Sequence, residues 1–123
     1  MGIYVKSVEL LPSLHEAANK YHAAYQLLPN SKKNIELLNK DILEIDFSDA
    51  NIIYIPSTLF KYDFLKKVAK KCSKLKEGTT IITLKNPMPC ITEDDTNVIF
   101  DTYKKEEHLM TWGRELVIYQ TKL

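Results

Sequence analysis

Two apolar, β-branched segments separated by one helix length constrain this chain more than any other feature. They are residues 50–55 and residues 79–84. Strands that are apolar at nearly every position are typical of a parallel sheet, because both of its faces are covered. Residues 59–76 between them carry an apolar stripe at helical spacing, and Gly78 follows as the expected helix C-cap. We therefore expect two adjacent parallel strands joined by a crossover helix.

Weaker patterns extend this unit on both sides. Residues 3–8 and 34–39 are strand candidates. Between them, Ser13 and Glu16 have capping-box spacing, which predicts a helix from about Ser13 to a stop at Pro29. Residues 97–103 and 115–121 are expected to pair antiparallel at a sheet edge, joined by a loop that holds Trp112. The apolar positions of the first helix predict one buried face and are Leu14, Ala17, Ala18, Tyr21, Tyr25 and Leu28.

Composition limits the classes of protein that fit. A chain of 123 residues, 45% hydrophobic and 27% charged, is expected to form one domain, 1–123. The net charge of +1 gives no indication of a nucleic-acid or membrane partner. No apolar run reaches the ~20 residues that span a bilayer, and no signal peptide is recognisable, so we expect an intracellular protein, cytoplasmic or nuclear. Cys72 and Cys90 are then expected to be free thiols.

Three stretches carry a family resemblance, residues 5–18, 41–60 and 76–85. In their order and spacing they resemble the class I S-adenosylmethionine-dependent methyltransferases. The resemblance implies an α/β fold, a doubly wound Rossmann-like sheet that is mostly parallel and ends in a C-terminal antiparallel hairpin. Small-molecule sites in such folds lie at the carboxyl ends of the strands.

The resemblance also implies a cofactor, S-adenosylmethionine. Glu9 would accept both ribose hydroxyls, as an ionised carboxylate can. Asp41 would accept from the adenine amino group, and Ile42 would contact the ring. The full implied cofactor set is Glu9, Leu10, Asp41, Ile42 and Ser57. Two plainer interpretations stay open, a solvated Glu9 at a strand end and an ordinary turn residue at Asp41.

The nearest branch is the non-SET histone-lysine methyltransferases. That branch has a strand, a polar turn and an aromatic residue, followed by a helix and a further strand. The matching segments in this chain are residues 55–60, 75–78 and 81–85. Residues 110–119 are similar to the final hairpin of small members of the branch. This implies catalytic roles for Ser57, Thr58 and Phe60 and a protein methyl acceptor. Pro56 departs from the pattern, because it stands where that branch usually carries Asn and has no side-chain amide.

The cofactor loop of the family has no counterpart in the sequence. That loop is glycine-rich and follows the first strand, whereas this chain has only Gly2, Gly78 and Gly113. The first strand of the sheet is therefore expected to be missing. A truncated product, a strand supplied by a second copy or a partner chain, and direct closure of the sheet are three explanations, and we favour self-association or a partner.

The leading hypothesis is a protein-lysine type methyltransferase, incomplete at its N-terminus. The alternative is a non-catalytic methyltransferase-like interaction subunit. A flavodoxin-like nucleotide-binding domain is disfavoured, because no phosphate loop is present. His15 and His22 share one helix side, but no further ligand completes a metal set. The lysine-rich helix at residues 66–76 is interpreted as a solvated face.

Overall fold

The computed structural model describes residues 4–28, 34–93 and 95–123. Its contacts divide the chain into two compact units, Met1–Ile45 and Asp46–Leu123. Each unit is described by itself, and the expectation of a single domain stays a prediction. The helix stop expected at Pro29 and the glycine at position 2 lie outside the described residues.

Unit 1 is a small β-α-β element. It contains strand β1 (Val5–Val8), helix α1 (Pro12–Gln26), strand β2 (Ile35–Leu38) and the 3-10 helix η1 (Ile42–Glu44). β1 and β2 pair in parallel, and Val5 lies opposite Ile35. Helix α1 begins at Pro12 rather than Ser13, and Leu11 is its N-cap without a side-chain hydrogen bond. The predicted capping box is therefore wrong. Proline at the first helical position has a φ already fixed near the helical value, and it leaves one backbone N–H fewer without an acceptor.

The apolar face of α1 is not buried as predicted. No residue of this helix is buried, and Leu14 is 52% exposed. Tyr21 and Leu28, two other members of the predicted stripe, are exposed as well. A two-stranded sheet offers too little apolar surface to cover such a helix, so the apolar side chains of α1 stay exposed.

Unit 2 contains the predicted central β-α-β unit. Strand β3 (Ile52–Ile55) pairs in parallel with β4 (Thr80–Leu84), which confirms the leading expectation from the sequence. The α-helical part of the connection between β3 and β4 is shorter than predicted. It consists of the 3-10 helix η2 (Ser57–Leu59), helix α2 (Tyr62–Lys71) and the 3-10 helix η3 (Cys72–Lys74). Gly78 has a φ of +87°, and its left-handed backbone turns the chain into β4 rather than directly capping α2.

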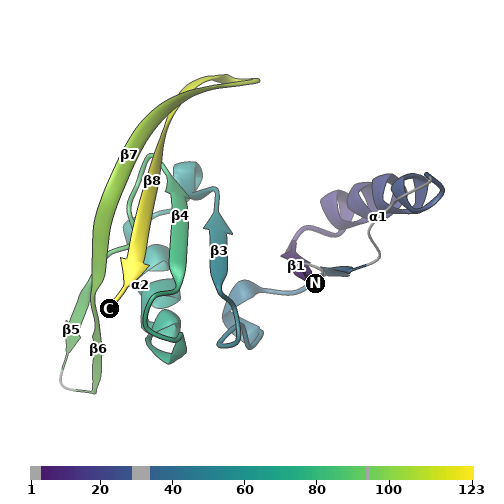
Figure 1. Ribbon diagram of the computed structural model, residues 1–123. Coiled ribbons are helices and arrows are strands. Elements are labelled where there is room, and N and C mark those ends of the chain that lie inside the picture. The colour runs from purple at the N-terminus through teal and green to yellow at the C-terminus, as the bar shows by residue number, and fades with distance from the viewer. Residues whose placement is uncertain (1–3, 29–33, 94) are drawn as a thin grey trace. The chain divides into compact units, whose positions relative to one another are not determined.

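The C-terminal part is a long hairpin preceded by a short one. Strands β7 (Phe100–Met110) and β8 (Gly113–Lys122) pair antiparallel, as predicted, and complete a four-stranded sheet of order β3-β4-β8-β7. The bounds differ, because β7 begins at Phe100 rather than at residue 97 and continues to Met110 through the predicted loop. The short hairpin of β5 (Ile91–Glu93) and β6 (Thr96–Val98) was not predicted. β7 and β8 are joined by a two-residue turn and, as Figure 1 shows, run on beyond the ends of β3 and β4 as a two-stranded ribbon.

The core belongs to unit 2. Helix α2, which lies behind the sheet in Figure 1, buries Leu65, Val68 and Ala69. Ile81 of β4 is 0% exposed, and Ile118 of β8 is almost fully buried. On the outer side of α2, Lys66 and Lys70 form ion pairs with Glu93 of β5, at 4.0 and 2.8 Å. Part of the lysine-rich face therefore ties the helix to the short hairpin.

The thiols of both cysteines are free. Cys72 is buried at the end of α2, and burial raises the pKa of its thiol to about 12. Cys90 is exposed, and its sulfur accepts from the backbone N–H of Phe100 at 3.3 Å. A buried thiol with a raised pKa is inert, whereas an exposed thiol is open to reagents.

Each unit has a strand with one open edge. Among the described residues, β1 has β2 as its ladder partner, and β3 has β4. Direct pairing of the strand around Val5 with the strand around Ile53, one of the three explanations considered for a missing first strand, would join the two units and stays a prediction. In residues 4–28, 34–93 and 95–123, no helix has the length and apolar character needed to cross a membrane.

Candidate functional site

The carboxyl ends of β1 and β2 bring two predicted cofactor ligands to one edge of unit 1. Glu9 directly follows β1, and Asp41 lies three residues after β2. Because the two strands are parallel, both residues are at the same end of the sheet. Asn39 joins the two ends, and its Nδ2 donates to the carbonyl oxygens of Glu9 and Leu10 at 2.8 and 3.0 Å. Asn39 was not predicted from the sequence, although its place directly after a strand is a recognisable signal.

The two carboxylates have acceptor capacity beyond the hydrogen bonds found for them. Glu9 accepts from the backbone N–H of Leu11 through Oε1 at 3.1 Å. Asp41 caps η1, and its Oδ1 accepts from the backbone N–H of Leu43 at 2.9 Å. An ionised carboxylate has about four lone-pair sites, so each side chain can accept further donors. Leu10 is exposed and Ile42 is half-buried beside them.

The carboxyl end of β3 holds the predicted catalytic residues, in unit 2. Ser57 is 0% exposed, and its hydroxyl lies 2.8 Å from the carbonyl of Leu84 and 3.0 Å from that of Asn86. The single hydroxyl proton of Ser57 is therefore used to tie the end of β3 to the end of β4. This geometry gives Ser57 a positioning role in the fold, while a direct role toward a ligand stays a prediction.

The neighbours of Ser57 differ in what they offer a ligand. The Oγ1 of Thr58 is buried and finds no hydrogen-bond partner among the described residues. Phe60 is partly exposed and packs edge-on against Phe64, with ring centroids 4.9 Å apart. Pro56 is exposed and contributes no side-chain donor or acceptor. Among the three predicted catalytic residues, Phe60 is therefore the most exposed, Thr58 is half-buried with its hydroxyl oxygen covered, and Ser57 is buried.

Asn86 is a polar residue of this strand end that the sequence analysis did not select. It lies in the turn directly after β4, and its Nδ2 is 3.5 Å from the carbonyl oxygen of Ser57. The preceding residue, Lys85, has a φ of 66° and is the only non-glycine residue of the described chain with positive φ. The Asn-Pro dipeptide after an apolar strand was the available sequence signal for a turn here.

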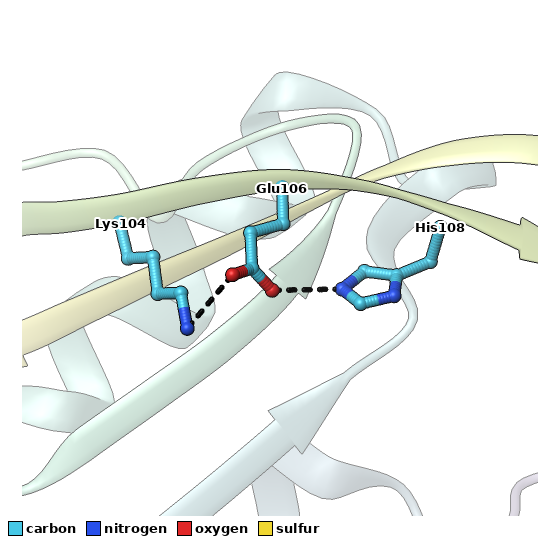
Figure 2. Close-up of polar contacts among 3 residues, drawn as sticks. All are labelled: Lys104, Glu106 and His108. Atoms are coloured by element: carbon cyan, nitrogen blue, oxygen red, sulfur yellow. Dashed lines mark hydrogen bonds and ion pairs between the residues drawn. The ribbon is translucent and has the colours of Figure 1, made fainter.

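A second polar cluster lies on the long hairpin. Figure 2 shows Glu106 between Lys104 and His108, all on β7. Glu106 pairs with the Nζ of Lys104 at 2.8 Å and with the Nε2 of His108 at 2.9 Å. The hydrogen bond from Lys104, followed by that from His108, holds the pKa of the Glu106 carboxyl below its usual range. This cluster is exposed and stands on alternate residues of one strand, so it is a local ion-pair ladder.

Metal ligation has no support in the described residues, where no group of three His, Cys, Asp or Glu side chains gathers. The two histidines of α1 instead contact side chains one turn later. His15 lies 3.1 Å from Asn19, and His22 lies 2.9 Å from Gln26.

Comparison with known proteins finds solved structures with a similar fold, but no relative by sequence. No protein-family model matches the chain, and no curated protein matches it. Among solved structures, the RNA methyltransferase from Salinibacter ruber in complex with S-adenosyl-L-homocysteine is similar with a TM-score of 0.66 at 18% identity. That match covers 98% of this chain and 66% of the other.

Two further structures are similar. One is yhhF from Escherichia coli, named as a methyltransferase, with a TM-score of 0.64, 12% identity and coverage of 96% of this chain and 64% of that one. The other is a protein from Haemophilus influenzae named as a methylase, with a TM-score of 0.60, 14% identity and coverage of 95% and 71%. The chain thus spans about two thirds of the length of these proteins. None of them is a histone-lysine methyltransferase, so that branch receives no support. At these identities the likeness shows that the chain has the mixed α/β fold of this group of methyltransferases.

Proposed function

We propose that this chain is part of an S-adenosylmethionine-dependent methyltransferase that acts on RNA. The observation that carries the proposal is the fold likeness over 98% of the chain to an RNA methyltransferase whose structure holds S-adenosyl-L-homocysteine. When bound, the cofactor supplies an activated methyl group. The residues of the chain would bind the cofactor and orient the methyl acceptor.

The carboxylates of unit 1 fit the adenosine part of such a cofactor. Glu9 and Asp41 lie at the same end of two parallel strands, and each has lone pairs beyond the one hydrogen bond described for it. Two ribose hydroxyls and an adenine amino group are all donors, which suits acceptor-only side chains. The exposed Leu10 and half-buried Ile42 would contact the apolar faces of the adenosine.

The amino-acid part of the cofactor has no comparable holder in the described residues. Gly78 precedes β4 and Gly113 starts β8, so neither belongs to a loop after a first strand. We therefore expect the chain to bind S-adenosylhomocysteine weakly and mainly through its adenosine. The family's first strand and its loop would be contributed from outside the described residues.

RNA is favoured over a protein lysine as the methyl acceptor. One of the three structures compared is named as an RNA methyltransferase, and none as acting on protein. Pro56 also removes the amide that the lysine branch usually carries at this strand end. The near-neutral net charge of +1 means that any contact with phosphates depends on local cations rather than on a global field.

Saturation-transfer NMR tests the cofactor proposal, because it detects ligands that bind too weakly for calorimetry. With S-adenosylhomocysteine, saturation should reach the adenine and ribose protons more strongly than the methionine-chain protons. The double variant Glu9→Gln, Asp41→Asn should abolish the adenosine signal. Glu16→Gln, an exposed acid on α1, is the matched control and should retain it. An adenosine signal that survives the double variant would place the site elsewhere.

Methyl transfer from radiolabelled S-adenosylmethionine tests the acceptor. Total RNA and total cytosolic protein are offered in parallel to the purified chain. We expect label that ribonuclease releases and protease does not. Label retained in protein would return the acceptor to the lysine hypothesis.

A non-catalytic interaction subunit is the second candidate function. The open edge of β3 favours it, since Ile52 is 66% exposed and Tyr54 is 56% exposed on this strand. An apolar strand with an unpaired edge invites strand addition by a second copy or a partner chain. In that case the chain should bind no S-adenosylhomocysteine and should form a complex through β3.

A further inference from the structure

The positive charge of this protein is concentrated on the connection between β3 and β4. Seven of the 17 Lys and Arg residues stand between residues 61 and 76, where Asp63 is the one acid. Because the whole chain has a net charge of +1, the remainder of the chain carries an excess of acids. The near-neutral total is therefore compatible with a strong local positive potential along α2 and η3.

Four of these lysines follow helical spacing and form what we call the lysine stripe, which consists of Lys67, Lys70, Lys71 and Lys74. The opposite side of α2 buries Leu65, Val68 and Ala69 in the core, so the stripe lies on the outer side. Lys67 and Lys71 are one α-helical turn apart, and Lys71 and Lys74 are one 3-10 turn apart. The stripe is therefore a row of cations about 12 Å long on one side of the element.

The stripe is unfavourable to the helix that carries it. Lys67 and Lys71 are like charges at a spacing of four residues, and so are Lys70 and Lys74, and such pairs destabilise a helix. Cations in the last turn do complement the helix dipole, but this effect reaches Lys70 and Lys71 and not Lys67. A row of anions bound along the stripe would remove the repulsion between its lysines.

The structure already holds one oxyanion at the edge of the stripe. The carboxylate of Glu93, on β5, lies 2.8 Å from the Nζ of Lys70 and 4.0 Å from that of Lys66. Lys67 and Lys74 are exposed and form no ion pair within the described residues. One side of the stripe is thus neutralised by the protein itself, while Lys67 and Lys74 can bind an external anion.

We propose that the lysine stripe binds the phosphate backbone of RNA. The inference rests on the proposed function and adds to it a binding surface outside the strand ends of the candidate site. The connection starts at the carboxyl end of β3, but the stripe runs along it to η3, toward the amino end of β4.

RNA fits the stripe better than a membrane surface does. RNA is the polyanion that the proposed function supplies, and successive phosphates match a row of cations. A helix that lies in a membrane surface needs a free apolar face, whereas the apolar side of α2 is buried in the core of unit 2.

Fluorescence anisotropy of a labelled oligouridylate with the full chain tests the stripe, and this RNA contains no adenine that unit 1 is proposed to bind. The double variant Lys67→Gln, Lys74→Gln should weaken binding roughly three- to tenfold at low salt. It should also lower the slope of log affinity against log salt by about 1.4, since each contact with a single-strand phosphate contributes about 0.7. Lys67→Arg, Lys74→Arg keeps both charges and should retain the wild-type affinity.

The matched control is Lys6→Gln, Lys105→Gln, which removes two exposed lysines of β1 and β7 and changes the net charge by the same amount. It should bind RNA as the wild type does. Equal losses in the two Gln double variants, or unchanged affinity in Lys67→Gln, Lys74→Gln, would overturn the inference. Binding to phosphatidylserine vesicles without binding to RNA would overturn it as well.

The proposed function is measured separately on the wild type, through ribonuclease-sensitive methyl label and the adenosine signal of S-adenosylhomocysteine. Label in RNA together with unchanged RNA affinity in Lys67→Gln, Lys74→Gln would refute the stripe alone. Absence of both signals in the wild type would refute the proposed function.

Discussion

The two units of this chain differ in how much apolar surface they bury and in which candidate ligands they carry. Unit 2 has a buried core in which Ile81 and Cys72 are inaccessible to solvent, whereas helix α1 of unit 1 buries no residue. Yet unit 1 holds Glu9 and Asp41, the carboxylates best suited to a cofactor. A pair of strands with one helix is marginal by itself, because it removes little apolar surface from water. The difference indicates that unit 1, which carries the proposed cofactor ligands, gains little stability from burial among its own residues.

The largest expected difference between the two units is in the free energy of unfolding after truncation of one apolar side chain in each. Ile81→Ala should lower the free energy of unfolding by about 2–5 kcal/mol, because it leaves a cavity in a closed core. Leu14→Ala in α1, with 52% exposure before the change, should alter it by no more than about 0.5 kcal/mol. Urea unfolding followed by circular dichroism measures both. Equal losses would show that the two units share one core.

The buried and the exposed thiol of unit 2 should differ in how they affect the pH dependence of stability. Burial raises the pKa of Cys72 from an ordinary 9.0 to about 12. The folded state therefore prefers the neutral thiol, and this contribution is complete below pH 9 and is lost as the pH rises toward 12. At pH 10.5 the wild type should have lost about 2 kcal/mol more than Cys72→Ala, relative to pH 8. Cys90→Ala, which removes an exposed thiol, should follow the wild type. Parallel pH curves for wild type and Cys72→Ala would contradict the burial argument.

The open edge of β3 predicts self-association, which light scattering would detect at high micromolar concentration. Ile52→Lys should weaken that association by about tenfold, because a charge on an exposed edge opposes strand addition. Tyr103→Lys, an exposed apolar residue on the far edge strand β7, is the control. A monomeric wild type at these concentrations would exclude a second copy as the source of a first strand.

The sequence predicted the elements whose patterns are strong and local. The parallel pair β3 and β4 follows from two β-branched segments one helix apart, and burial on both sides enforces that pattern. The prediction of a buried face on α1 was wrong, because helical periodicity shows which side of a helix is apolar and not whether another element packs against that side. The β5–β6 hairpin was missed, since its three-residue strands are too short to carry a period.

The candidate site was predictable only in part. Glu9 and Asp41 were selected through the family resemblance, and the parallel pairing of β1 and β2 places both at one edge of unit 1. Asn86 could not be selected in this way. Its orientation depends on Lys85 at a positive φ and on a serine 29 residues away in the sequence. Neither the strain nor this long-range contact appears in a local pattern.

The smallest expected effect concerns that strained turn. Lys85→Gly removes the side chain that disfavours a φ of 66°, which stabilises the fold, but it also frees the unfolded chain. These two terms oppose each other, so the free energy of unfolding should change by no more than about 1 kcal/mol. Urea unfolding of Lys85→Gly beside Lys85→Ala, which lacks the charge but keeps the Cβ, measures this difference, and a loss above about 2 kcal/mol in Lys85→Gly would contradict the expectation.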